Sequence, residues 1–169
     1  MQADQQGANF ARYAVNPRVL IFITRPGEIL LLKGAPTKRL WANRYNALGG
    51  HIERGEDVYT AAQRELREET GITVPLHLCG LMMVDTGGNP GVALYIFRNL
   101  EEDAPHGALL PSEEGTLHWV SPAQLESLPI LPDLPQLLPR VLAWQPGSAP
   151  FSARLTFADD DTPQIVFFG

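Results

Sequence analysis

The sequence predicts an α/β or α+β sandwich, with several β-strands and few helices in one domain that spans residues 1–169. The length of 169 residues and the 44% share of hydrophobic residues suit a single domain with a sizeable core. Fifteen glycines and fifteen prolines imply many turns between aliphatic runs of strand length. One longer segment, residues 57–70, has helix-forming residues throughout and no internal glycine or proline.

The amino-terminal part is expected to open with a β-hairpin. Residues 18–24 and 28–33 are aliphatic runs, and the Arg-Pro-Gly sequence at 25–27 favours a turn between them. The apolar pattern stops at residues 34–45, where basic residues accumulate without an acid. We interpret this segment as a positively charged loop, which is either a solvated connector or a surface that meets an anionic ligand.

A helix is expected over residues 57–70, with acidic residues in its first turn. Gly71 stands where a left-handed residue would close the last turn. Residues 72–86 and 92–97 are rich in strand-forming residues and are separated by a turn sequence at 87–91. They predict a second pair of strands.

The carboxy-terminal part is expected to hold shorter elements. Residues 116–120 predict a strand, and a short helix is expected to begin after Ser121, which is followed by a proline and a capping-box glutamine. Residues 134–144 predict a further helix whose limits are obscured by two prolines. The runs at 151–157 and 164–168 predict a closing hairpin.

Composition excludes several classes of function. Thirteen basic against nineteen acidic residues give a net charge of -6, which disfavours a nucleic acid polymer as partner because such binding relies on positive charge. The single cysteine, Cys79, excludes an intramolecular disulfide and a multi-cysteine zinc site, and it is expected to be a small buried residue. No apolar stretch approaches the ~18 residues that span a membrane, and the first ten residues lack the pattern of a signal peptide. We therefore expect a cytoplasmic protein, while monomer and homodimer both stay open.

The expected helix carries an unusual acidic stripe. At about 100° per residue, Glu65 and Glu69 fall on the same side as Val58 and Ala62, and Glu68 lies beside them. One side of the helix therefore has small apolar residues near its start, as expected of a side that faces the core. The same side has carboxylates near its end, and these repel one another. A divalent cation is the simplest compensating charge, and oxygen ligands select Mg²⁺ or Mn²⁺ over zinc.

The alternative is an exposed acidic helix face that forms salt bridges with Arg64 and Arg67. The preceding segment, residues 49–56, weakens this alternative because it is a glycine-rich loop that runs into the helix start. Its glycines allow close approach to a ligand, and the Gly49 carbonyl could add an oxygen ligand to a metal. Glu56 and Arg64 are spaced to form an ion pair that fixes this loop on the helix.

Residues 50–72 resemble the Nudix box, the signature of the Nudix hydrolases. The resemblance is specific because every fixed position of the motif is present. These positions are Gly50, Glu56, Arg64, Glu65, Leu66, Glu68, Glu69, Gly71 and Ile72. The resemblance implies a Nudix α/β/α sandwich with a mixed β-sheet, and Mg²⁺-dependent attack of water on a nucleoside diphosphate linked to another moiety.

The same resemblance implies roles for individual residues. Glu65, Glu68 and Glu69 would be ligands of Mg²⁺, or of Mn²⁺ in its place, and one of them is a candidate base. The Gly49 carbonyl would be a further ligand, and Arg64 would belong to the catalytic machinery. A structural role is implied for Glu56, Gly50 and Gly71.

Family members often take one more carboxylate from a loop beyond the box. Glu113 and Glu114 are the candidates in this sequence, and we prefer Glu113. The alternative for each is a solvated acid on a loop.

Two segments outside the box bear on the substrate. Residues 44–50 resemble the aromatic-Asn-Gly-x-Gly-Gly segment of MutT-type enzymes, which hydrolyse oxidised purine nucleoside triphosphates such as 8-oxo-dGTP. Asn46 would offer a purine edge both a donor and an acceptor. Residues 131–134 resemble a Trp-Pro-Asp-Asp element that contacts the base in such enzymes. This resemblance makes Asp133 a candidate for binding the base. The alternatives are a strand-end residue at Asn46 and a helix cap at Asp133.

The sequence departs from the MutT pattern in three ways: Tyr45 replaces a tryptophan, Ala47 replaces a glycine, and one of the two aspartates is absent. These departures bear on the base preference and not on the hydrolytic centre. Lys38 and Arg44 are expected to help attract the polyphosphate. The leading hypothesis is hydrolysis of a small-molecule nucleotide, an oxidised purine nucleoside triphosphate, to the monophosphate and pyrophosphate. The alternatives are an ADP-ribose or nucleotide-sugar pyrophosphatase, and a Nudix-like domain that senses a nucleotide without hydrolysing it.

Overall fold

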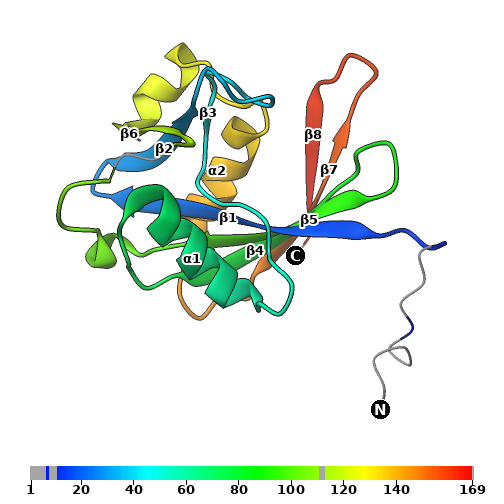
Figure 1. The fold of residues 1–169 in the computed structure, drawn as a ribbon, viewed down its shortest axis with the longest axis horizontal. Coiled ribbons are helices and arrows are strands. Elements are labelled where there is room, and N and C mark those ends of the chain that lie inside the picture. The colour runs from blue at the N-terminus through cyan, green and yellow to red at the C-terminus, as the bar shows by residue number, and fades with distance from the viewer. Residues whose placement is uncertain (1–6, 8–10, 111–112, 169) are drawn as a thin grey trace.

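The computed structural model describes residues 7, 11–110 and 113–168, and they form one mixed sheet with helices on both of its faces (Figure 1). The strands are β1 (Val15–Arg25), β2 (Glu28–Gly34), β3 (Tyr45–Asn46), β4 (His77–Val84), β5 (Gly91–Arg98), β6 (Gly115–Val120), β7 (Phe151–Phe157) and β8 (Pro163–Phe168). The helices are α1 (Val58–Thr70) and α2 (Leu134–Ala143), with 3₁₀ turns η2 (Glu101–Asp103) and η3 (Pro122–Ser127).

The order of strands in the sheet is β3-β2-β1-β5-β4-β7-β8, and β6 also pairs with β2. The pairs β1 with β5 and β4 with β7 are parallel, whereas the other pairs are antiparallel. The predicted hairpins β1–β2 and β7–β8 are both present, with Arg25 opposite Glu28 and Phe157 opposite Pro163.

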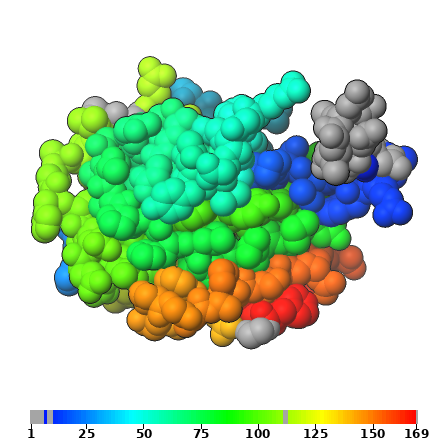
Figure 2. All heavy atoms as spheres, turned by 90° about the horizontal axis from the view of Figure 1, so that it is seen from below, coloured from blue at the N-terminus to red at the C-terminus, as the bar shows by residue number. Residues whose placement is uncertain are grey.

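The core consists of two layers, one on each face of the sheet. Ile21 and Ile23 of β1 are fully buried in the layer that includes α1. Leu20 and Phe22, which alternate with them, are buried in the layer that includes α2. In the space-filling view, α1 (teal) lies toward one side of the visible face and the C-terminal strands (orange to red) lie at the opposite side (Figure 2). The predicted α/β sandwich with a mixed sheet is therefore confirmed.

Helix α1 has a cap at each end. The side chain of Asp57 accepts hydrogen bonds from the N–H groups of Tyr59 and Thr60 at 2.8 and 3.0 Å. Gly71 has a φ of 75° and donates its N–H to the Arg67 carbonyl at 2.8 Å, as predicted. The expected start was wrong by one residue, and the first turn holds no acid, because Asp57 is the cap and not part of the helix.

The expected strand over residues 72–86 was wrong in its first part, since β4 begins only at His77. Pro75 has no N–H to give to a ladder. The carbonyl of Val74 instead accepts a hydrogen bond from the Gln63 side chain at 3.0 Å, which ties this segment to α1. Its apolar residues are buried without forming a strand.

Smaller differences arise in the other elements. The short strand β3 lies at the end of the expected loop, where Tyr45 pairs with Lys33 of β2. The short helix after Ser121 is a 3₁₀ turn, with the Ser121 N–H donated to the Gln124 side chain at 3.0 Å. Helix α2 ends at Ala143, one residue before the expected limit, and contains Pro139.

The Asp57 cap makes a prediction about stability. Replacing Asp57 with Ala leaves the N–H groups of Tyr59 and Thr60 without their acceptor, so we expect a loss of about 1 kcal/mol in the free energy of unfolding. Urea denaturation monitored by circular dichroism measures this loss. Asp159→Ala, at an exposed turn, is the matched control and should have little effect. Equal effects of the two substitutions would contradict the capping role.

Candidate active site

The last two turns of α1 bring their three acids to the edge of one acidic cavity of about 640 Å³. Glu69 is buried, with 6% of its surface exposed, whereas Glu68 has 58% of its side chain exposed and Glu65 lies between these extremes. The residues around the cavity are Arg18, Lys38, Gly49, Gly50, His51, Glu53, Glu65, Glu68, Glu69, Glu113 and Glu114. The structure therefore places five of the acids singled out by the sequence around one space.

Glu69 is a carboxyl group in an unfavourable environment. Burial raises its pKa to about 7, and the nearby negative charge of Glu65 acts in the same direction. The N–H of Gly49 opposes this shift by donating a hydrogen bond to Glu69 Oε2 at 2.9 Å. The site thus holds a carboxyl group that titrates near neutral pH when no cation is bound.

The glycines of the loop allow it to approach both β1 and α1. The Leu48 and Gly50 carbonyls accept hydrogen bonds from the N–H groups of Ile21 and Val19 of β1, at 2.8 and 2.9 Å. Gly49 lies between them with a φ of 130°, a conformation that favours glycine. A Cβ atom at Gly50 would overlap the Glu65 carboxylate, so only a glycine at this position allows that carboxylate to lie against the loop.

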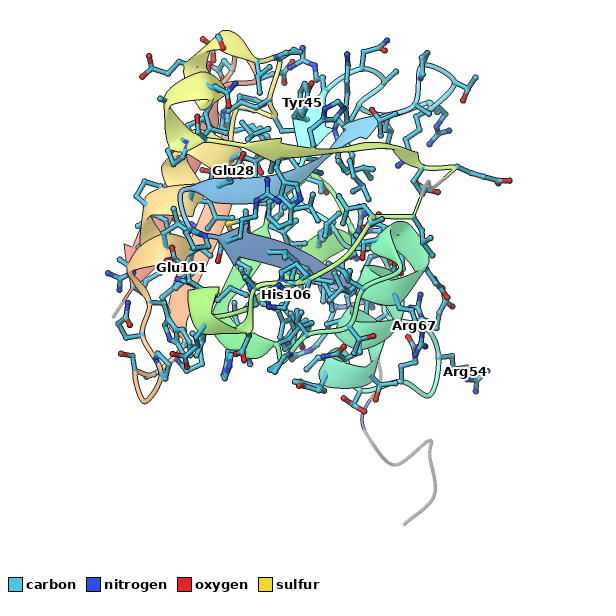
Figure 3. The ribbon with its side chains drawn as sticks, turned by 90° about the vertical axis from the view of Figure 1, so that its left-hand side faces the viewer. Glu28, Tyr45, Arg54, Arg67, Glu101 and His106 are labelled. Carbon is cyan, nitrogen blue, oxygen red and sulfur yellow. The ribbon has the colours of Figure 1, made fainter. Side chains whose placement is uncertain are left out.

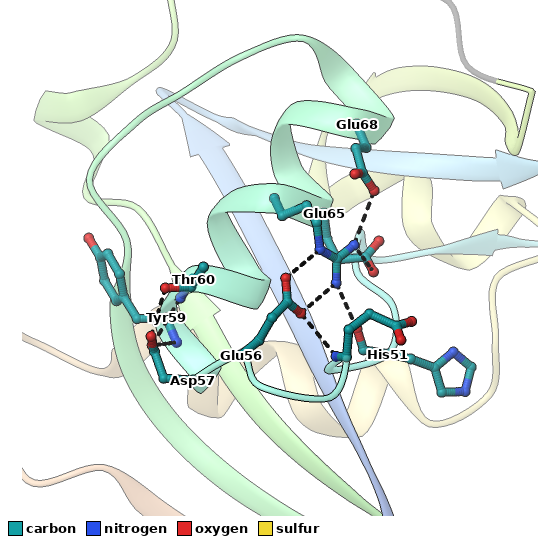
Figure 4. Close-up of polar contacts among 9 residues, drawn as sticks. His51, Glu56, Asp57, Tyr59, Thr60, Glu65 and Glu68 are labelled. Carbon is teal, nitrogen blue, oxygen red and sulfur yellow. Dashed lines mark hydrogen bonds and ion pairs between the residues drawn. The ribbon is translucent and has the colours of Figure 1, made fainter.

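Arg64 joins the loop to the helix, and Figure 4 labels its partners His51, Glu56, Glu65 and Glu68. Its guanidinium group donates to Glu56 at 2.7 and 2.9 Å and to the His51 carbonyl at 3.0 Å. It also reaches Glu65 at 2.8 Å and Glu68 at 3.1 Å. The predicted Glu56–Arg64 ion pair is therefore confirmed, and it lowers the pKa of Glu56 to about 2.

The acidic stripe is only partly an exposed, salt-bridged face. Glu65 and Glu68 do pair with Arg64, as that alternative expects, but Glu69 is turned inward to Gly49. Arg67 lies on the outer side of α1, away from the sheet (Figure 3). The buried carboxyl group of Glu69 is the part of the stripe that surface ion pairing does not explain.

The carboxylates do not form a preassembled metal cage. Among residues 7, 11–110 and 113–168, no group of three acidic, histidine or cysteine side chains is close enough to hold an ion. Glu65 and Glu68 are turned to Arg64, and Glu114 forms an ion pair with Lys38. Lys38, which we expected to meet substrate, thus lies in the acidic cavity beside a carboxylate.

A second and larger cavity, of about 870 Å³, adjoins the first, and most of its surface is apolar. Arg18 and Gly49 line both cavities. The predicted substrate residues Arg44, Asn46 and Asp133 all lie around the larger one. The structure thus brings together three residues that are separated by up to 89 positions in the sequence.

Two of these residues have polar groups with distinct properties. The Asn46 side-chain oxygen accepts the N–H of Ala47 at 2.8 Å, which orients its amide group. Burial raises the pKa of the Asp133 carboxyl group. Asp133 stands at the start of α2, but within the described chain its side chain makes no capping hydrogen bond to that helix. Asp133 is therefore the N-cap residue of α2 by position, as the helix-cap alternative expects, but without a capping hydrogen bond from its side chain.

Arg18 and Trp41, which also line the larger cavity, were not predicted from the sequence. Arg18 begins the aliphatic run of β1, and Trp41 lies in the basic loop with a φ of 62°. The Arg18 Cζ atom lies 5.7 Å from the centre of the Trp41 ring. The available signal for Arg18 was a charged residue directly before the buried run of β1, but this signal does not show which side of the sheet the charge faces.

Comparison with known proteins decides the family, since a sequence model of the NUDIX domain matches residues 15–145. The chain belongs to the Nudix family. This Nudix protein is 30% identical over 145 residues to the oxidized purine nucleoside triphosphate hydrolase of Mus musculus, covering 85% of this chain and 87% of that one. It is 33% identical over 102 residues to the enzyme of the same name from Danio rerio, covering 59% and 62%. The crystal structure of a MutT protein from Bacillus halodurans has the same fold, with a TM-score of 0.71 and 22% identity over 90% of this chain and 97% of that one.

Family membership gives the general activity. The protein is a Nudix pyrophosphohydrolase, and its substrate is a small molecule of the nucleotide type that is typical of these enzymes. Enzymes of this family generally use divalent metal ions. Among the helices of the described residues, none has the length and apolar character needed to cross a lipid bilayer.

The contribution of the Glu56–Arg64 pair to stability should depend on pH. The folded-state pKa of Glu56 lies below the ordinary value of 4.5, so the pair contributes stability above pH 4.5 and loses it as the pH falls toward 2. We expect Glu56→Gln to unfold at a lower temperature than the unchanged protein at pH 7. The difference should shrink as the pH falls below about 4.5.

Thermal unfolding at several pH values measures this effect. Glu126→Gln, which removes an exposed acid of the 3₁₀ turn η3, should show no such pH-dependent difference. A difference for Glu56→Gln that stayed constant down to the lowest pH at which the protein folds would contradict the electrostatic origin.

Proposed function

We propose that this Nudix enzyme hydrolyses oxidised purine nucleoside triphosphates, with 8-oxo-dGTP as the best single substrate, to the monophosphate and pyrophosphate. The observation that carries the proposal is the pair of adjoining cavities, one largely apolar and one acidic. A nucleotide has the same division, because its base is mostly apolar on both faces and its phosphates are anions that bind with cations. The relative from Mus musculus, which carries the name of such an enzyme, supports the same substrate class.

The apolar cavity offers suitable groups for a purine edge. The amide of Asn46 has donor and acceptor atoms. Burial raises the pKa of the Asp133 carboxyl group, whose oxygens accept hydrogen bonds from a base edge. An 8-oxo purine differs from an ordinary purine in presenting an N–H at position 7 and a carbonyl at position 8. Together, Asn46 and Asp133 can offer hydrogen-bond donors and acceptors to such an edge.

The acidic cavity has the donor set that Mg²⁺ prefers. Glu69 is a buried carboxyl group whose ionised form needs a cation, and the lack of a side chain at Gly50 lets the Glu65 carboxylate lie against the loop. We propose that Glu65, Glu68, Glu69 and the Gly49 carbonyl hold Mg²⁺, for which Mn²⁺ can substitute. When bound, the cation neutralises phosphate charge and lowers the pKa of a bound water. Glu113 is the preferred additional ligand, because Glu114 is paired with Lys38.

The other residues act by binding and orientation. Arg64 and Glu56 hold the glycine loop on α1 and so fix the positions of the acids around the cavity. Lys38 and Arg44 carry positive charge toward the two cavities and favour the approach of a polyphosphate. A water that attacks the phosphate chain would give up its proton to one of the three α1 carboxylates.

The first test removes the charge of single acids. Glu68→Gln and Glu69→Gln keep the shape of the side chain but lose a negative ligand, so we expect pyrophosphate release with Mg²⁺ to fall by at least about 100-fold. Glu126→Gln is the matched control and should retain full activity. Unchanged turnover of both site variants over a panel of nucleotides and Mg²⁺ concentrations would contradict the proposed hydrolytic site.

The second test concerns the base. At equal concentrations we expect faster pyrophosphate release from 8-oxo-dGTP than from dGTP, and faster hydrolysis of either than of ADP-ribose. Asn46→Ala and Asp133→Ala should each raise the KM for 8-oxo-dGTP by about 10-fold or more, because a hydrogen bond to the base edge is lost. A preference for ADP-ribose would refute the substrate and favour the alternative pyrophosphatase, and tight nucleotide binding without turnover would favour a sensing domain.

A further inference from the structure

Arg18 is placed at the junction of the two cavities. The two residues that line both are Arg18 and Gly49, and Gly49 contributes no side chain. The position of Arg18 is fixed by the sheet, because it pairs with Leu94 of β5 on one side and with His51 of the glycine loop on the other. Its guanidinium group is therefore the side-chain group that both cavities share.

The guanidinium group of Arg18 is a half-buried positive charge. Among the described residues it forms no ion pair or hydrogen bond with a carboxylate, and its neighbour is the Trp41 ring at 5.7 Å. Burial lowers its pKa, while the charges of Glu65 and Glu69 act in the opposite direction. A guanidinium group has five N–H donors in one plane, which match phosphate oxygens well.

The order of the cavities matches the order of groups along a nucleotide. If the base lies in the apolar cavity and the terminal phosphates lie in the acidic one, the phosphate attached to the nucleoside lies at the junction. We infer that Arg18 binds this first phosphate, with the Trp41 ring limiting the positions of its guanidinium group. The inference rests on the proposed function for the placement of the nucleotide, but it does not depend on which base is bound.

The contribution of Arg18 to nucleotide binding can be measured apart from the metal-dependent contribution of the acids. A nucleoside monophosphate retains the first phosphate and lacks the phosphates that need a metal. Arg18 should therefore favour a nucleoside monophosphate over the corresponding nucleoside even without a divalent cation. A binding measurement in EDTA examines this contact independently of hydrolysis.

The experiment compares the affinities of nucleotide and nucleoside by calorimetric titration of the full chain in EDTA. The probes are 8-oxo-dGMP with 8-oxo-deoxyguanosine and, in parallel, AMP with adenosine. We expect the unchanged protein to bind the monophosphate about 10- to 100-fold more tightly than its nucleoside for the pair whose base it accepts. Arg18→Gln should remove most of this ratio and leave the nucleoside affinity unchanged. Arg18→Lys, which keeps the charge but not the planar fork, should keep part of it.

Arg25→Gln is the matched control, because Arg25 lies on the same strand and its guanidinium carbon lies 4.2 Å from the centre of the Trp119 ring. It changes the net charge equally and should retain the full ratio. An unchanged ratio in Arg18→Gln, an equal loss in Arg25→Gln, or no preference for the monophosphate in the unchanged protein would each overturn the inference. Preference for AMP over 8-oxo-dGMP, with the ratio still lost in Arg18→Gln, would refute the proposed base while supporting the role of Arg18.

Discussion

The contact of Arg64 with both the glycine loop and α1 is the constraint on which the arrangement of this site depends. One guanidinium group binds a loop carboxylate, a loop carbonyl and two helix carboxylates. These acids would otherwise repel one another and turn to solvent. Because the guanidinium group is planar and has several donors, it fixes the position of the loop along the axis of α1. The Gly49 N–H can then meet Glu69 at the next turn.

The sheet supplies the second constraint. The centre of β1 lies between the two core layers and carries apolar side chains on both faces. The strand also pairs with the glycine loop, so the acidic cavity is built on the same strand that forms a wall of the apolar one. Residues 131–133, which precede α2, and the hairpin of β7 and β8 complete the apolar cavity from the carboxy-terminal part of the sequence. A division between an apolar and an acidic space thus results from elements that are far apart in the chain.

Elements defined by local signals could be predicted from the sequence, and those defined by distant contacts could not. Helix α1 has its cap at Asp57 and its closing glycine at Gly71, and both act within a few residues. The late start of β4 has a local signal in Pro75, but the hydrogen bond from Gln63 to Val74, which holds the segment before β4 against α1, could not be predicted from the sequence.

The same distinction applies to the candidate site. The acids of α1 could be selected from their spacing on one helix, because that spacing alone puts them on one face. Asn46 and Asp133 were selected through resemblance, since nothing local to either residue indicates that they share a cavity. Arg18 was missed because its exposure to both cavities depends on the pairing of β1 with residues 48–50. Backbone hydrogen bonds between Val19 and Gly50 and between Ile21 and Leu48 set the offset between β1 and the loop. A shift of β1 by one residue against both the loop and β5 would turn Arg18 to the opposite face of the sheet and away from both cavities, although the strand would keep the same composition.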